Sequence, residues 1–317
     1  MIGPRHLSSV GAGAEVLQRF PSTASVFLPG GQAPQQGSVF RQPDLARALE
    51  SIAIDGAAAF SRGWLADSTV AQMERGGGII THEDLAAYEA VWRDPVTLGY
   101  RGYEIITMPP PSSGGVTMGQ ILNIVESFDL ASFGWLSADH VHVVVEAMRR
   151  AYADRNFFLG DPDFVDIPMG RLLSQAYADS LAGTINMRLA SDSRAFNRVP
   201  EESTQTTHYS IVDRDGNAVA VTTTINSWFG SKVVVRGAGF LLNNEMDDFT
   251  SKPGVPNQFG LVQGEANAIE PGKRMLSAMT PTIVVDPEGR TDLVTGTPGG
   301  ATIITTIAQI VSNHIDF

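Results

Sequence analysis

The spacing of apolar residues changes along this chain, from helical periodicity in the first half to strand-like alternation in the second. Residues 1–100 are predicted to be mainly helical. "RQPDLARALESIAIDGAAAF" repeats apolar residues at helical spacing, and "THEDLAAYEAV" opens with Thr81 followed by two acidic residues, as helix N-termini often do. Residues 137–160 are predicted to form one long helix that ends at Gly160.

Between these helices, "YRGYEIITMPPPSSGG" predicts a short strand, a proline stop and a turn of small residues at 109–115. The helical pattern "VTMGQILNIVESF" follows it. From 183 to 205 the apolar period is lost in a stretch rich in Ser, Arg and Asn. We expect an exposed, mobile connector here, of the kind in which backbone cleavage is tolerated.

After residue 205 the pattern becomes that of β-structure. "HYSIVDRDGNAVAVTTTIN" places two alternating runs around "RDGN", and "TPTIVVDPEGRTDLVTGTPGG" does the same around "PEG", so each predicts a hairpin. The helical "ATIITTIAQIVSNHI" comes last. Hairpins beside long helices indicate an α+β protein with helices layered on sheets.

Composition removes several classes of function. Asp and Glu outnumber Lys and Arg by 34 to 22, and the net charge of −12 argues against nucleic-acid binding, which depends on a basic surface. The absence of cysteine excludes disulfides, a cysteine nucleophile and thiolate metal sites. The six histidines are scattered without metal-ligand spacing, so neither a metal nor another cofactor is expected. No apolar run approaches the roughly 20 residues that span a bilayer, so no membrane segment is expected.

The stretch "STQTTHYSIVD" has two interpretations. It is either a polar loop that enters a strand, or a site where the bond between Gln205 and Thr206 is cut. In the second case the freed α-amino group of Thr206, with a pKa near 8, can act as the base for its own hydroxyl. A Ser/His/Asp arrangement is then unnecessary.

Two further stretches also carry alternatives. "LLNNEMDDF" (241–249) is either a solvated turn or a cluster of carboxylates and amides that surrounds an ammonium group. "TGTPGG" (295–300) is either a plain strand-to-helix turn or a set of backbone N–H donors for an oxyanion. The pattern alone does not decide between them.

Taken together, these stretches resemble the γ-glutamyltransferase (γ-glutamyltranspeptidase) family of N-terminal-nucleophile hydrolases. The matching strings lie in the family's order over nearly the whole chain: "MPPPSSGG" (108–115), "AYADR" (151–155), "LGDPDF" (159–164), "QTTHYSIVD" (205–213), "GNAVAVT" (216–222), "LLNNEMDDF" (241–249), "KPGVPN" (252–257), "KRMLSAMTPTIV" (273–284) and "TGTPGG" (295–300). The resemblance implies a four-layer αββα sandwich, incomplete in this chain. It also implies a precursor that cuts itself before Thr206.

The resemblance assigns a role to each candidate residue. Thr206 is the nucleophile that takes a γ-glutamyl group as an acyl ester, and the hydroxyl of Thr224 bonds to it. The backbones of Gly299 and Gly300 form the oxyanion hole. The remaining assignments concern the amino-acid head of the substrate: Asn226, Glu245 and Asp248 at the ammonium group, and Ser277 at the carboxylate.

The chain departs from the family pattern at three points. Ala278 replaces the second serine of the carboxylate pair. Phe259 stands in the lid-like loop where some members have a tyrosine that reaches the position of Asn226. The matched region begins partway into the large subunit and stops at "NHIDF", so a chain truncated at both ends is expected. The large-subunit arginine that pairs with the substrate carboxylate has no counterpart here.

The resemblance therefore implies a glutathione hydrolase and γ-glutamyltransferase that uses no cofactor. Its partners are expected to be glutathione or other γ-glutamyl compounds, with water, amino acids or peptides as acceptors. Residues 1–205 would belong to the large subunit and 206–317 to the small one, both from one precursor and in one globular unit. A periplasmic or secreted location is expected. The alternatives are a glutaryl (cephalosporin-type) amidase, or a fragment that binds amino acids without turnover.

Overall fold

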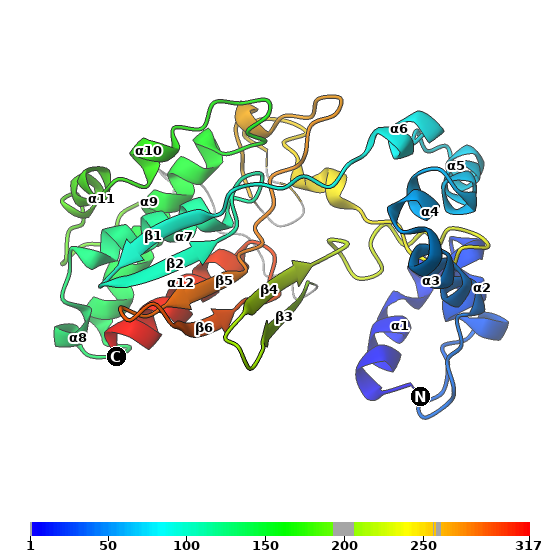
Figure 1. The fold of residues 1–317 in the computed structure, drawn as a ribbon, viewed down its shortest axis with the longest axis horizontal. Helices are drawn as coiled ribbons and strands as arrows, with labels where there is room; N and C mark the ends of the chain where they lie inside the picture. The colour runs from blue at the N-terminus through cyan, green and yellow to red at the C-terminus, as the bar shows by residue number, and fades with distance from the viewer. Residues whose placement is uncertain (1, 193–205, 256, 258–260) are drawn as a thin grey trace. The chain divides into compact units, whose positions relative to one another are not determined.

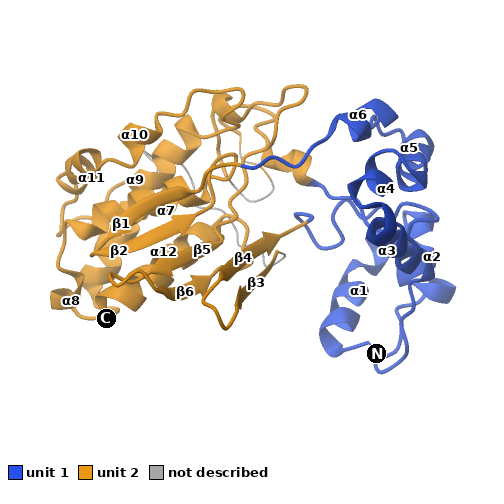
Figure 2. Ribbon diagram, viewed as in Figure 1, with its two compact units in different colours: residues 1–92, 225–244 blue, residues 93–224, 245–317 orange. Residues whose placement is uncertain are grey.

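The computed structural model describes residues 2–192, 206–255, 257 and 261–317. These residues divide into two compact units, shown in different colours in Figure 2. Unit 1 contains Met1–Trp92 and Ile225–Asn244, and unit 2 contains Arg93–Thr224 and Glu245–Phe317. These boundaries differ from the predicted division between the large and small subunits at 205/206. That division concerns cleavage of the chain, which the compact units do not test, and it stays a prediction.

Unit 1 is helical, as the spacing of apolar residues in the first 100 residues predicts. Two small apolar cores hold it together, and each includes residues from the inserted stretch 225–244, such as Val234 and Val235. The hydroxyl of Thr23 ties that stretch to the helices, because it donates to Lys232 O at 2.7 Å and accepts from Val234 N at 2.9 Å. The helical elements are α1 (Pro4–Leu17), α2 (Pro21–Phe27), η1 (Pro29–Gly31), α3 (Pro43–Asp55), α4 (Ala57–Ser61), α5 (Trp64–Gly76) and α6 (His82–Ala87).

Unit 2 is built on a four-stranded antiparallel sheet with the order β1-β2-β5-β6 (Figure 1). The strands are β1 (Val96–Tyr100), β2 (Tyr103–Thr107), β5 (Thr282–Val285) and β6 (Thr291–Thr295). The β2–β5 pairing, from Glu104 opposite Val285 to Thr107 opposite Thr282, joins segments far apart in the sequence. The sheet is therefore made of two hairpins placed edge to edge.

Helices cover this sheet and form the large core of unit 2 (Figure 1). Residues 114–125 of α7 are buried without interruption, as expected for a helix enclosed on all sides. Leu122, Ala147 and Ile307 bring α7, α9 and α12 into one apolar cluster with the strands. The helices of unit 2 are α7 (Gly114–Glu126), α8 (Leu130–Phe133), α9 (Ala138–Phe158), α10 (Met169–Leu172), α11 (Gln175–Ala182) and α12 (Thr302–Asp316), with the short turns η3 (Glu245–Asp248) and η4 (Glu265–Asn267).

The second sheet is the hairpin of β3 (Thr207–Val212) and β4 (Ala218–Thr223), which packs against β5 and β6. Both hairpins predicted from "RDGN" and "PEG" are confirmed, as are the long helix α9 and the last helix α12. The fold is α+β, as predicted. The described residues of unit 2 supply a helical layer and two sheets, which correspond to part of an αββα sandwich.

One element differs from the prediction. The short strand predicted in "YRGYEIITMPPPSSGG" is confirmed as β2. A second strand, β1, precedes it within residues 1–100, which were predicted to be mainly helical, and the two strands are joined at Arg101 and Gly102. Both of these residues have positive φ, 52° and 88°, which is the geometry of a tight turn between antiparallel strands. The prediction therefore missed β1. The turn was missed because Arg at its first position carries none of the usual Asn or Asp chemistry.

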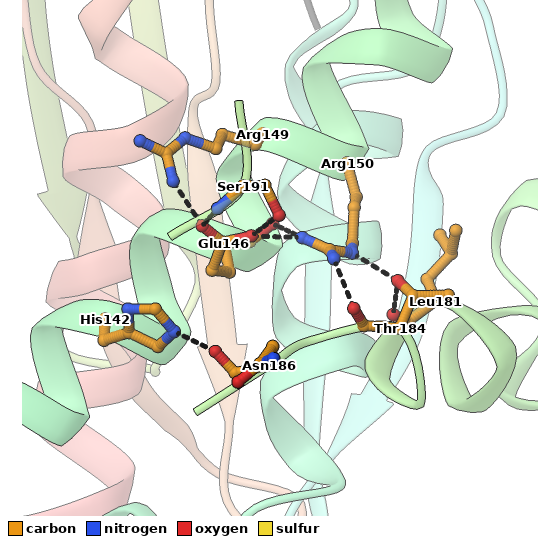
Figure 3. A network of polar contacts seen from close by, with 8 residues as sticks. All are labelled: His142, Glu146, Arg149, Arg150, Leu181, Thr184, Asn186 and Ser191. Carbon is orange, nitrogen blue, oxygen red and sulfur yellow. Dashed lines mark hydrogen bonds and ion pairs between the residues drawn. The ribbon is translucent and has the colours of Figure 1, made fainter. Parts of the chain in front are cut away.

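Side chains of α9 hold the start of the predicted connector (Figure 3). His142, Glu146 and Arg150 lie four residues apart along one face of the helix. They bond to Asn186 O at 2.9 Å, to Ser191 N at 3.0 Å and to Thr184 Oγ1 at 2.8 Å, respectively. Most residues of 183–192 are exposed, as expected, yet they follow α9 closely. The rest of the connector, 193–205, lies outside the described residues.

Candidate active site

The two threonines of the predicted nucleophile pair lie opposite each other at the open end of the β3–β4 hairpin. Thr207 pairs with Thr223 in the antiparallel register, so the residues just outside the strands, Thr206 and Thr224, face each other next. The Thr206 hydroxyl donates to Oγ1 of Thr224 across 3.4 Å. Both side chains are half-buried. The hairpin register therefore brings the predicted nucleophile and the predicted second threonine together.

The "TGTPGG" loop lies beside the first residues of β3. A Cβ atom added at Gly296 would fall 2.1 Å from Nδ1 of His208, so only glycine leaves room for this ring. The ring also bonds to Thr222 Oγ1 at 2.8 Å and Ser210 Oγ at 3.0 Å, which links it to both strands of the hairpin. Burial lowers the pKa of His208. His208 therefore helps to pack the loop against the hairpin that carries Thr206.

The glycines of this loop expose backbone donors just before α12. Gly299 has φ 145° and Gly300 has φ 54°, both in the region that favours glycine. Their carbonyl oxygens accept bonds from Thr302 and Ile303, but neither N–H group donates to any acceptor within the described part of the chain. Two adjacent N–H groups at the start of a helix are suited to binding a negatively charged oxygen.

The acidic cluster forms a turn rather than a strand end. Glu245 and Asp248 are the first and last residues of η3. Two side chains hold the end of this turn: Asn267 Nδ2 and Gln263 Nε2 donate to the Asp248 carbonyl oxygen at 2.7 and 3.1 Å. Burial raises the pKa of Glu245 to about 7. An approaching ammonium group would favour the ionised form of this carboxyl.

Ser277 is held by the turn at 111–113. Its backbone N–H donates to Pro111 O at 2.9 Å, and its carbonyl oxygen accepts from Ser113 N at 2.8 Å. The Ser277 hydroxyl accepts from Met279 N at 3.1 Å, which leaves its hydrogen able to donate. Ala278, where the family has a second serine, packs against the core of unit 2.

Asn226 belongs to unit 1, whereas the other described candidate residues belong to unit 2. Its φ of 72° is left-handed, and its side-chain amide donates to Asn244 O at 3.3 Å. This hydrogen bond joins the two ends of the inserted segment 225–244. Gln205 and Phe259 lie outside the described residues.

Sequence reasoning missed two polar residues that are connected to Ser277. Arg155 lies in α9 and Ser113 precedes α7, and both are buried. Each belongs to a string that matched the family, "AYADR" or "MPPPSSGG", yet neither carried a role. The signal in the sequence that could have identified Arg155 is a basic residue in the last turn of a predicted helix, among largely apolar residues.

The described residues form neither a metal-binding cluster nor a membrane-spanning helix. No group of three or more His, Cys, Asp or Glu side chains is arranged to hold a metal ion there. Within the same residues, no helix is both long and apolar enough to cross a membrane.

Comparisons with known proteins first define a class. A cephalosporin acylase from Bacillus halodurans superposes on the whole chain with a TM-score of 0.83 at 28% identity, covering 56% of that structure. The γ-glutamyltranspeptidase of Helicobacter pylori superposes on 61% of the chain, and on 56% of its own, with a TM-score of 0.60 at 41% identity. These neighbours are N-terminal-nucleophile hydrolases, and the α+β fold is the one they share.

The family follows from sequence comparison. The family model described as "Gamma-glutamyltranspeptidase" matches residues 2–317, and the chain belongs to this family. A glutathione hydrolase proenzyme from Escherichia coli is 51% identical over 308 residues, which cover 96% of this chain and 53% of that protein. An acylase ACY 1 proenzyme from a Pseudomonas strain is 40% identical over 300 residues, 95% of this chain and 52% of that protein. The chain spans about half the length of the curated relatives it matches.

Proposed function

We propose that this chain is the self-cleaving region of a glutathione hydrolase and γ-glutamyltransferase. The observation that carries the proposal is the Thr206–Thr224 pair, with the hydroxyl of one threonine 3.4 Å from that of the other. It is supported by family membership and by relatives that are named glutathione hydrolase proenzymes.

The first step is cleavage of the chain. The hydroxyl oxygen of Thr206 attacks the carbonyl carbon of Gln205, and the peptide nitrogen leaves as the α-amine of Thr206. Water then hydrolyses the resulting ester, which frees the carboxylate of Gln205 and restores the hydroxyl. The new amine is now placed to accept the proton of that hydroxyl in later reactions.

The second step uses the same oxygen on substrate. Thr206 attacks the γ-carbonyl of a γ-glutamyl amide such as glutathione, and the negative charge that develops on oxygen meets the N–H groups of Gly299 and Gly300. The amine leaves with a proton, and an acyl ester remains on Thr206. Water or the amine of an acceptor amino acid or peptide then takes the acyl group.

The amino-acid head of the substrate carries two charges. In the proposed arrangement Glu245 and Asp248 hold its ammonium group, and Ser277 donates to its carboxylate; Asn226 is assigned to the ammonium group by the family resemblance alone. Carboxylates beside an ammonium group and a hydroxyl beside a carboxylate are charge-assisted pairings, which are the stronger class of hydrogen bond. Neither step needs a metal or an organic cofactor.

Cleavage between Gln205 and Thr206 is tested by intact mass. Wild-type protein is expected to divide into two chains, of roughly two-thirds and one-third of the length, whereas Thr206→Ala stays whole because no hydroxyl remains. Thr206→Ser keeps the hydroxyl and is expected to cleave. Thermal unfolding of all three variants shows whether they are folded. A folded wild-type protein that stays whole after prolonged incubation contradicts the proposal.

A second candidate function, a glutaryl amidase, is favoured by the acylases among the relatives. A glutaryl amide keeps the carboxylate of a γ-glutamyl amide and lacks only its α-amine, and both an acylase proenzyme and a cephalosporin acylase structure are among the relatives. The two functions are separated by comparing kcat/KM for a γ-glutamyl anilide and a glutaryl anilide. A higher value for the glutaryl compound would favour the amidase. Binding of glutamate without turnover of either anilide would favour the non-catalytic alternative.

We also propose a subunit composition and a cellular location for this protein. After cleavage, residues before and after the 205/206 bond would form the large and small subunits of one enzyme. We place this enzyme in the periplasm or outside the cell, on family resemblance alone. Cell fractionation of the source organism tests that location.

A further inference from the structure

Arg155 is a buried cation that the proposed reaction does not use. Its side chain lies in the last turn of α9, and the residue is 1% exposed. It forms no ion pair within the described residues. Its Nε donates to Ser113 Oγ at 2.9 Å and Nη1 donates to Asn156 Oδ1 at 3.1 Å, so both acceptors are neutral. Burying a charge without a paired carboxylate costs free energy of folding. We therefore looked to function for a reason that this arginine is buried here.

Ser113 connects Arg155 to Ser277 through hydrogen bonds. Its hydroxyl accepts from Arg155 and donates to Ser277 O at 2.7 Å, while its backbone N–H donates to the same oxygen at 2.8 Å. Ser113 is fully buried, and both functions of its hydroxyl are occupied. The direction of its hydrogen is therefore set by the arginine, which can only donate.

The charge of Arg155 also acts on the other half of the proposed head-group site. Burial lowers the pKa of Arg155, and the negative charge of Asp248 opposes this shift. Tyr152, whose ring lies 5.9 Å from the guanidinium, is neutral because burial raises its pKa to about 12. Arg155 thus carries a positive charge and is linked, through Ser113, to the segment of Ser277.

We propose that Arg155 is a positioning residue for the carboxylate-binding part of the site. Through Ser113 it holds the segment that carries Ser277, and its charge makes that part of the site favourable for an anion. The inference rests on the proposed function, since it takes Ser277 as the group that meets the substrate carboxylate. Arg155 acts through Ser113, and we assign it no direct contact with substrate.

The test uses calorimetry on cleaved wild-type protein and three small ligands. L-Glutamate carries the α-amine and α-carboxylate, glutarate lacks the amine, and 4-aminobutyrate lacks the α-carboxylate. Ser113→Ala is expected to weaken glutamate and glutarate about tenfold, the size of one hydrogen bond to a charged group, and to leave 4-aminobutyrate unchanged. Equal weakening of all three ligands would indicate general damage and overturn the inference.

A double-mutant cycle separates the relay from simple packing. Arg155→Lys keeps the charge and loses the Nε geometry, so its effect on glutamate affinity is expected to be non-additive with that of Ser113→Ala. Ser112→Ala is the matched control, because Ser112 donates to Met279 O at 2.6 Å from the same turn but has no bond to Arg155. Its effect is expected to be additive with Arg155→Lys.

The outcomes distinguish this inference from the proposed function. Wild-type protein that binds none of the ligands would overturn both. Wild-type protein that binds glutamate, with Ser113→Ala equally tight, would overturn the role of Arg155 and leave the proposed function standing. If Arg155→Lys does not fold, as urea unfolding would show, the three-ligand comparison on Ser113→Ala still decides.

Discussion

At the scale of single residues, the ends of one hairpin decide where the proposed chemistry takes place. Three threonines surround Gln205, and the sequence alone gave no geometric reason to choose among them. Antiparallel pairing of Thr207 with Thr223 makes Thr206 and Thr224 the next opposed pair. The sequence predicts this hairpin but not its register. A two-residue turn at Asp215 and Gly216 would set Thr206 opposite Ile225, whereas the structure pairs Val212 with Ala218 and so sets Thr206 opposite Thr224.

Glu245 provides a prediction about pH. Burial raises its pKa to about 7, so the carboxyl is mostly neutral at pH 6 and mostly ionised at pH 8. An ammonium group binds the ionised form better, and glutamate affinity is therefore expected to increase as pH rises through 7. Calorimetry at pH 6, 7 and 8 measures this dependence.

The matched variant is Glu245→Gln, which cannot ionise. It is expected to bind glutamate more weakly at pH 8 and to lose the change of affinity between pH 6 and 8. The same raised pKa has the opposite effect on folding: because the folded pKa exceeds the unfolded one, this residue destabilises the protein as pH rises from about 4.5 through 7. An unchanged pH profile in the variant would remove Glu245 from the ammonium site.

At the scale of secondary-structure elements, α9 is both a core helix and an anchor. Glu146 is fully buried and accepts from Arg149, from Arg150 at 2.6 Å and from the Ser191 hydroxyl at 2.6 Å. Burial would raise the pKa of Glu146, but the hydrogen bonds from Ser191 and Arg150 outweigh it and lower the pKa to about 2 (Figure 3). A buried carboxylate with this many donors stays ionised.

Glu146→Gln is expected to lower the free energy of unfolding by about 3 kcal/mol, because it leaves a buried arginine without its ion pair. In wild-type protein, a folded pKa below the unfolded value means that the contribution of Glu146 is complete above about pH 4.5 and is lost as pH falls to about 2. Urea unfolding between pH 3 and 7 measures both effects.

The control for this variant is Glu288→Gln, which removes an exposed partner of Arg290. Exposed pairs contribute about 0–1 kcal/mol, so this change is expected to be small at every pH. Similar losses in the two variants would show that the Glu146 network contributes no more than a surface pair.

At the scale of the whole molecule, the proposed cut passes between strands of one sheet. β1 and β2 precede residue 205, β5 and β6 follow it, and the β2–β5 ladder joins them. Further bonds cross the same division, such as that from Tyr100 Oη to Asp316 Oδ2 at 2.5 Å. Cleavage is therefore expected to leave two chains that remain associated.

Size-exclusion chromatography and denaturing electrophoresis test this expectation together. Cleaved wild-type protein is expected to elute with uncleaved Thr206→Ala in native buffer and to separate into two bands under denaturing conditions. Two separate native peaks would show that the sheet does not hold the subunits together.

The sequence by itself determined the local elements and the candidate chemistry. Alternation and turn residues are short-range properties, so both hairpins of the second half, α9 and α12 were predictable, and the ordered family strings pointed to Thr206, Glu245, Ser277 and the two glycines. The exception at Arg101 and Gly102 was a turn whose side-chain chemistry is uncommon.

Only the tertiary structure decided which distant residues support those candidates. Ser113 lies 42 residues from Arg155 and 164 from Ser277, and their link depends on how α7, α9 and the strand region pack. The same packing sets the burial that shifts the pKa of Glu245 and Glu146. Periodicity carries no information about such contacts, because burial and charge pairing arise only when segments far apart in the chain exclude water from the same place.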